Sequence, residues 1–90
     1  MTSPKARPVQ DTSTDIHVSR GLILYNDHVN TFDFVIESLV EVCDHNPEQA
    51  EQCALIAHFK GKCNVREGDF VELKPMCDEL TLRRLTVSIE

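Results

Sequence analysis

The chain has 90 residues, of which 41% are hydrophobic and 27% are charged, and its formal net charge at pH 7 is −6. This length and composition are typical of one small globular domain and differ from those of disordered or collagen-like chains. The negative charge argues against nucleic-acid binding, because phosphates require a basic surface. No run of about 18 apolar residues is present, so the sequence predicts no membrane-spanning helix. Composition narrows the class of protein but does not name a function.

The N-terminal residues bear on the compartment and on domain organisation. Residues 1–9 are polar, contain two prolines and lack the apolar core of a secretory signal peptide. We therefore expect a cytoplasmic protein whose four cysteines are reduced thiols. Proline, serine and threonine are spread through residues 1–19, which predicts a flexible N-terminal arm followed by one core domain over residues 20–90.

The core domain begins with a predicted strand and two predicted helices. Residues 21–25 (GLILY) form a short apolar run that is typical of a buried strand. Apolar residues then recur at helical spacing over residues 32–44, and either Asn30 or Thr31 can cap the start of that helix. A second helix is expected over residues 47–61, with asparagine and proline at its start and glycine as its C-terminal cap.

A strand, a helix and a final strand complete the pattern. Residues 62–66 and 85–89 alternate between apolar and polar side chains, as strands do. Residues 70–80 carry a helical apolar stripe after a turn and cap at Gly68 and Asp69, and Pro75 is expected to kink or divide this helix. The order β-α-α-β-α-β predicts a small α+β domain in which three helices cover one face of a three-stranded antiparallel sheet.

The cysteines could suggest a metal or a reactive thiol. Cys43, Cys53, Cys63 and Cys77 form no Cys-x-x-Cys pair, although structural zinc sites usually contain such pairs. Three of the four fall on apolar helical stripes, where a thiol behaves as a small hydrophobic side chain. We expect the cysteines to be side chains of the core, and we expect the protein to bind neither a metal nor a cofactor. A thiol or metal protein that uses the four cysteines with His58 remains the alternative.

The four histidines stand in different surroundings. His17 belongs to the arm and His45 to the turn between the first two helices, so both are expected to be solvated. His28 lies in the polar loop after the first strand, and His58 lies near the end of the second helix beside its apolar face. A histidine in the position of His58 is more often a structural residue than a functional one, unless it faces that loop.

The loop after the first strand carries the main chemical signal. Asn26 and Asp27 directly follow the buried strand and precede a helix, so their side chains can converge at the edge of the sheet. An amide oxygen, a carboxylate and an imidazole can together accept three hydrogen bonds from an ammonium group. The competing interpretation is a turn, because Asn and Asp side chains often bond to local backbone. Composition and spacing alone favour the turn.

Two segments together match a known pattern. Residues 22–35 (LILYNDHVNTFDFV) contain an apolar strand, Asn-Asp, a short loop and a helix that begins with an aromatic residue and Phe-Val. Residues 50–62 (AEQCALIAHFKGK) end in apolar-His-aromatic-x-Gly-Lys. In this order and spacing the two segments resemble the ClpS family, the adaptors of the ATP-dependent Clp protease. The resemblance extends over residues 21–90 and implies the same β-α-α-β-α-β fold.

The resemblance implies a non-enzymatic adaptor that binds N-degrons, which are proteins with an exposed bulky hydrophobic first residue such as Phe, Tyr, Trp or Leu. The positions matching the family's α-amino-binding residues are Asn26, Asp27 and His58. Those matching the hydrophobic pocket for the first side chain are Phe32, Ala54, Ala57 and Leu85, with His28 and Asn30 at the rim. No catalytic residue is implied. A third possibility is an interaction domain on the same fold that does not bind N-degrons.

Some positions depart from the family pattern. His28 stands where the family often has a second acid, which removes a negative charge and introduces a group that titrates near neutral pH. Ala54 stands where many members have Met, and Ala57 where a larger apolar residue is common. We expect a wider pocket, partly refilled by Phe32, and a changed preference for the first residue.

The resemblance also implies a protein partner. The positions that match the surface for the N-terminal domain of a Clp/Hsp100 AAA+ unfoldase are Gly61, Lys62, Asp69, Glu72 and Lys74. In the family the N-terminal arm helps to transfer the substrate, which would give residues 1–19 a function. We expect a monomer whose partners are this unfoldase and N-degron substrates. We expect it to bind neither nucleic acid nor a membrane.

Overall fold

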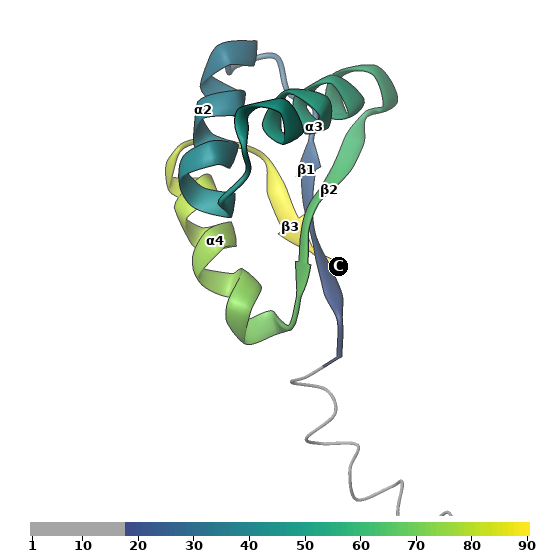
Figure 1. The fold of residues 1–90 in the computed structure, drawn as a ribbon, viewed down its shortest axis with the longest axis vertical. Coiled ribbons are helices and arrows are strands. Elements are labelled where there is room, and N and C mark those ends of the chain that lie inside the picture. Colours follow the sequence, from purple (N-terminus) through teal and green to yellow (C-terminus); the bar gives the residue numbers. More distant parts are fainter. Residues whose placement is uncertain (1–17) are drawn as a thin grey trace, which may run out of the picture.

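The structure is a computed structural model and describes residues 18–90. His17 and almost all of the predicted arm therefore lie outside the described residues. The six elements follow the predicted order (Figure 1), and their bounds are β1 Arg20–Tyr25, α2 Phe32–Cys43, α3 Pro47–Lys60, β2 Lys62–Gly68, α4 Phe70–Leu82 and β3 Val87–Ile89.

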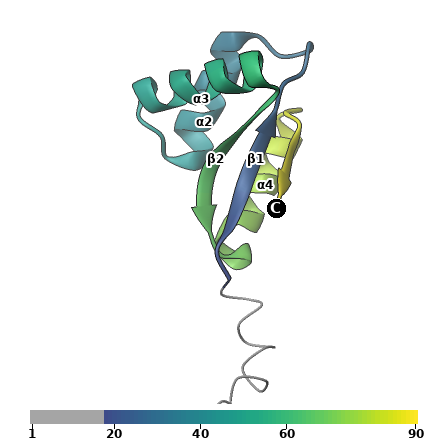
Figure 2. The ribbon, with the colours of Figure 1, turned by 90° about the vertical axis from the view of Figure 1, so that its right-hand side faces the viewer.

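The three strands form one antiparallel sheet in the order β2-β1-β3, so the first strand lies at the centre. The helices lie on one face of the sheet (Figures 1 and 2), as predicted. Leu22 and Leu24 of β1 are almost fully buried and belong to the core cluster, and the intervening Ile23 is also buried but lies outside that cluster. Successive side chains of a strand point to opposite faces, so Leu22 and Leu24 share the face that packs into the core. The predicted α+β fold is confirmed.

Each helix contributes an apolar stripe to the core. The buried side chains of this cluster include Leu39 and Cys43 of α2, Cys53 of α3, and Leu73 and Leu80 of α4. Leu39 and Cys43 are four residues apart and Leu73 and Leu80 are seven apart, and these spacings place each pair on one side of its helix. None of the helices in residues 18–90 is long and apolar enough to cross a membrane.

The helix ends follow from local sequence. Thr31 Oγ1, Asn46 Oδ1 and Asp69 Oδ1 accept hydrogen bonds from backbone N–H groups three residues further on, at 3.1, 2.7 and 2.8 Å. Such side chains satisfy donors that have no partner within the helix. Gly61 ends α3 with φ 95°, a left-handed conformation that glycine adopts without strain. Of the two predicted caps for α2, Thr31 is the one used.

The structure refines two predictions about the C-terminal half. Of the two outcomes expected at Pro75, a kink or a division, the division does not occur, because α4 runs through Pro75 as one element. Proline removes only the hydrogen bond to the carbonyl of the exposed Val71, and buried leucines hold the helix on both sides of it. β3 comprises three residues rather than five, because Leu85 N donates to Leu80 O at 3.0 Å and belongs to the turn after α4.

The prediction that His45 is solvated is also wrong. Its side chain is only 4% exposed, and Nε2 lies 2.6 Å from Val65 O. A carbonyl can only accept, so Nε2 carries the hydrogen. Leu22 pairs with Arg66 and Ile23 with Asn64, which leaves Val65 as the extra residue of a β-bulge. Bulges leave a backbone group outside the ladder, and His45 supplies the donor for the Val65 carbonyl.

Replacing His45 by Ala should destabilise the fold, because the buried Val65 carbonyl would lose its side-chain donor. We expect a loss of roughly 1–3 kcal/mol in the free energy of unfolding, measured with urea. The matched control is His28→Ala, which removes an exposed histidine and should change stability by less than about 0.5 kcal/mol. Equal effects of the two substitutions would contradict the structural role of His45.

Candidate functional site

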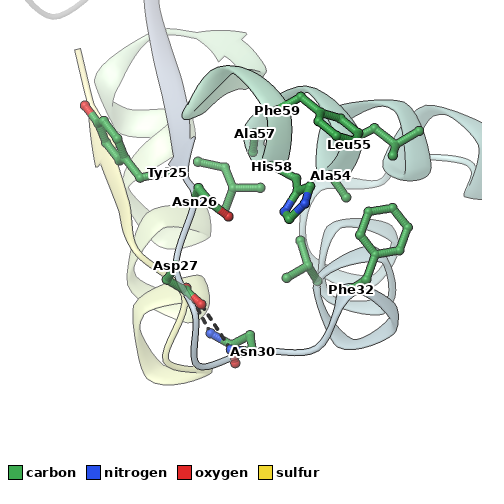
Figure 3. A pocket seen from close by; sticks show the side chains of 12 residues that line it. Tyr25, Asn26, Asp27, Asn30, Phe32, Ala54, Leu55, Ala57, His58 and Phe59 are labelled. Carbon is green, nitrogen blue, oxygen red and sulfur yellow. Dashed lines mark hydrogen bonds between the residues drawn. The ribbon is translucent and has the colours of Figure 1, made fainter.

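A pocket of about 460 Å³ lies where β1 ends, between the loop that follows it and helices α2 and α3 (Figure 3). Its lining combines polar side chains from the loop after β1 and from α3 with an apolar wall. The lining residues are Leu24, Tyr25, Asn26, Asp27, Asn30, Phe32, Val35, Ala54, Leu55, Ala57, His58 and Phe59. Pockets of this size with few polar groups are the usual form of a small-ligand or peptide site.

Backbone hydrogen bonds bring the two predicted segments together. Asn26 N donates to Gly61 O at 2.9 Å, which joins the first residue after β1 to the C-terminal cap of α3. His58 lies three residues before Gly61, about one helical turn away, and so reaches the same end of the sheet. Figure 3 shows Asn26 and His58 on either side of one space. The structure therefore meets the condition that His58 face the loop.

Asp27 organises the loop. Its Oδ1 accepts hydrogen bonds from Val29 N at 2.9 Å and Asn30 N at 3.0 Å, and its Oδ2 accepts from Asn30 Nδ2 at 3.1 Å. This is the turn that the sequence favoured. An ionised carboxylate has about four acceptor positions, so one remains after these three hydrogen bonds.

The same contacts determine the charge of Asp27. Partial burial acts to raise the pKa of the Asp27 carboxyl, but the hydrogen bonds from Asn30 and Val29 and the nearby His28 outweigh it and lower the pKa below its usual value. The carboxylate is therefore ionised at neutral pH. It provides a fixed negative charge on the polar side of the pocket.

The apolar wall is formed mainly by α3 and the start of α2. Ala54 and Ala57 are about 5% and 4% exposed, so their small side chains form the floor, and Phe32 lies at the opening with 39% of its surface exposed. Phe59 is 76% exposed and packs edge-to-face on His58, with ring centroids 4.9 Å apart. Leucines and Val35 complete the wall.

Two predicted residues lie elsewhere. Leu85 is 4% exposed but belongs to the core cluster and does not line the pocket, because the turn after α4 directs it inward. His28 is exposed and is not part of the lining, while its predicted neighbour on the rim, Asn30, is. Sequence reasoning missed five lining residues, namely Leu24, Tyr25, Val35, Leu55 and Phe59. For Leu55 and Phe59, the separation of four residues around His58, on one helix face, is the signal that could have found them.

The predicted docking residues form two groups. Gly61 and Lys62 lie at the start of β2, whereas Asp69, Glu72 and Lys74 follow its end. A strand of seven residues separates the groups by about 20 Å. The Glu72 carboxylate lies 3.4 Å from Arg66, and Lys74 pairs with Asp78 at 2.6 Å. Glu72 and Lys74 are exposed and Asp69 is half-buried, and whether these residues dock a partner stays a prediction.

The cysteines belong to the interior. Cys43, Cys53 and Cys63 are buried and Cys77 is half-buried, all as free thiols. Burial raises the pKa of Cys43 to about 11, and burial together with a hydrogen bond to Cys63 raises the pKa of Cys53 to about 12. Metals bind the thiolate, which is scarce at such values. Within residues 18–90 no three His, Cys, Asp or Glu side chains form a group that could hold a metal.

Replacing Asp27 by Asn should destabilise the protein in a pH-dependent way. A carboxyl whose pKa is lowered by folding stabilises the fold above its unfolded pKa of roughly 4, and this contribution disappears as the pH falls through the folded pKa. In urea unfolding, the difference in stability between wild type and variant should be largest near pH 7 and shrink toward pH 3. Glu37→Gln, on the exposed side of α2, is the control without this trend. A difference in stability that is the same at both pH values would contradict the lowered pKa of Asp27.

Comparison with known proteins adds the identity of the family. The model of the family described as "ATP-dependent Clp protease adaptor protein ClpS" matches residues 20–86. A ClpS from Campylobacter jejuni subsp. jejuni serotype O:23/36, strain 81-176, is 38% identical over 58 residues, which are 64% of this chain and 60% of that protein. A ClpS from Nitratidesulfovibrio vulgaris, strain Miyazaki F, is 34% identical over 55 residues, which are 59% of this chain and 55% of that protein.

Both relatives carry the name "ATP-dependent Clp protease adapter protein ClpS". The chain spans between half and two thirds of their lengths. The family model covers most of the chain, including β1, the polar loop, all three helices and β2. The chain therefore belongs to the ClpS family of Clp protease adaptor proteins.

Proposed function

We propose that the pocket binds the first residue of proteins that begin with a bulky hydrophobic side chain, such as Phe, Tyr, Trp or Leu. The chain would deliver these N-degron proteins to a Clp/Hsp100 AAA+ unfoldase for degradation. The observation that carries this proposal is that hydrogen-bond acceptors and an apolar wall meet in one pocket. An N-terminal residue offers the matching pair of groups, an ammonium and a side chain joined to one carbon.

The α-amino group would lie on the polar side of the pocket. Asn26 Oδ1 and an imidazole nitrogen of His58 would accept two of its hydrogens, and the remaining acceptor position of Asp27 would take the third. The negative charge of Asp27 favours a cation there. An internal residue has no ammonium group, so these acceptors would discriminate a chain end from any other position.

The first side chain would enter the space between α2 and α3. Ala54 and Ala57 leave room at the floor, and the Phe32 ring at the opening can cover one face of an aromatic guest. A fully buried apolar side chain stabilises a complex by roughly 1.5–3 kcal/mol. The apolar wall thus supplies affinity, and the acceptors supply the requirement for a free amino group.

The partner follows from the family rather than from the pocket. The relatives are named as adaptors of the ATP-dependent Clp protease, so an unfoldase of that system is the proposed recipient of substrate. A non-enzymatic role fits this proposal, since an adaptor needs a binding site and no reacting group. Docking through the predicted residues at the two ends of β2 forms part of the same proposal.

One observation favours a second candidate function. Asp27 makes three hydrogen bonds within its own loop, which would satisfy a purely structural role. An interaction domain that binds a Clp partner without recognising N-degrons remains the alternative. Peptides with a free and with an acetylated amino group distinguish the two functions.

Acetylation should abolish peptide binding. We expect fluorescence polarisation to show that a Phe-initiated peptide binds roughly 100-fold more tightly than its N-acetylated copy, because the acetyl group removes the charge and two of the three hydrogens. His58→Ala should weaken the free-amine peptide about tenfold. Glu48→Gln, at the exposed start of α3, is the control with unchanged affinity. Equal affinity for both peptide forms would support the interaction domain instead.

Filling the floor of the pocket should change the preference for the first residue. In Ala54→Met, the larger side chain occupies space that a Trp guest needs more than a Leu guest does. We expect affinity for a Trp-initiated peptide to fall at least about tenfold, with a smaller effect on a Leu-initiated one. The measurement is the ratio of the two Kd values in wild type and variant. Comparable affinities for Leu, Phe, Trp and Ile peptides in both proteins would dismiss the assignment of Ala54 to the pocket floor.

A further inference from the structure

We propose that Asn30 is a positioning residue that fixes the Asp27 carboxylate by tying it to the backbone of the turn after α4. The inference deepens the proposed function and rests on it for its effect on binding. The sequence places Asn30 only at the pocket rim. Its hydrogen bonds show that it also connects Asp27 to the Arg84 carbonyl.

The Asn30 amide connects two acceptors that are far apart in sequence. Nδ2 donates to Asp27 Oδ2 at 3.1 Å and to Arg84 O at 2.8 Å, across 54 residues of chain. The backbone N–H of Asn30 also donates to Asp27 Oδ1 at 3.0 Å. Each oxygen of the carboxylate therefore receives a hydrogen bond from Asn30, and Figure 3 shows the two side chains facing one another. Rotation of the carboxylate would break both bonds.

The Arg84 carbonyl is a well-fixed anchor. Arg84 has φ 72°, and its N–H donates to Thr81 O at 2.9 Å, while the next N–H, of Leu85, donates to Leu80 O at 3.0 Å. Leu85 itself is buried in the core. On the other side, Arg83 pairs with Glu41 of α2 at 2.8 Å. The turn is thus held by backbone bonds, a buried side chain and an ion pair.

The chemistry of the link requires an amide. A primary amide carries two hydrogens in one plane and can serve two acceptors at once, whereas a hydroxyl has one hydrogen and a carboxylate has none. Ser at position 30 could keep only one of the two contacts, and Ala could keep neither. Loss of the link would free the Asp27 side chain on the polar side of the pocket.

The first test follows the Asp27 carboxyl carbon by NMR during a pH titration. In Asn30→Ala the pKa of Asp27 should rise, because a hydrogen bond that favours the ionised form is lost, and Asn30→Ser should give a smaller rise. Asn64→Ala, an exposed asparagine of β2, is the matched control and should leave the titration unchanged. An Asp27 titration identical in wild type and Asn30→Ala would overturn the proposal.

The second test moves the anchor without touching the pocket. Arg84→Gly and Arg84→Val both remove the charge, but only glycine keeps the left-handed conformation without strain, because a β-branched residue disfavours positive φ. Val should therefore raise the pKa of Asp27 while Gly should not. Identical titrations for the two variants would show that the carbonyl position is irrelevant. Thermal melts of all variants establish that each is folded.

The third measurement links the Asn30–Asp27 contact to peptide binding. Asn30→Ala should weaken a free-amine Phe-initiated peptide about tenfold and leave the N-acetylated copy unaffected, which a general loss of stability would not do. Wild-type affinity in this variant would overturn the positioning role. If the wild-type protein binds neither peptide, the proposed function fails. The Asp27 titrations then decide by themselves whether Asn30 fixes the Asp27 carboxylate.

Discussion

The pocket depends on the hydrogen bond from Asn26 N to Gly61 O, which joins the end of the central strand to the end of α3. Without this junction, the acceptors of the loop and the imidazole of α3 would not share one space. The junction requires the chain to turn sharply after α3, and the positive φ of Gly61 allows that turn. Apart from Gly61 and its two chain neighbours, no heavy atom of residues 18–90 lies within 4 Å of where a Cβ would be at Gly61. The need for glycine there is therefore conformational rather than steric.

Features that are determined by neighbouring residues could be predicted from the sequence. The six elements, the asparagine cap of α3, the glycine that ends it and the apolar stripes all depend on side chains within one or two turns of each other. The family resemblance then brought Asn26, Asp27 and His58 to one site, and the geometry agrees with that grouping. Local signals and the family pattern point to the same fold, as expected for a sequence with one well-defined structure.

Features that depend on distant contacts could not be predicted. His45 is buried because a bulge 20 residues further on exposes the Val65 carbonyl to it, and no local pattern reveals that bulge. Leu85 does not line the pocket, because the turn after α4 directs its side chain into the core. For Asp27, a turn and a binding site were competing interpretations of the sequence. In the structure the two are compatible, because the carboxylate closes a turn and still lines the pocket.

The proposed function requires that a free α-amino group and an apolar side chain be bound together in this pocket. NMR chemical-shift mapping with phenylalaninamide and with N-acetylphenylalaninamide tests it most directly, because it reports which residues each small ligand affects. We expect chemical-shift changes at Asn26, Asp27, His58 and the α3 wall with the free amine and none with the acetylated form. Shifts outside the pocket, or equal shifts with both compounds, would contradict it.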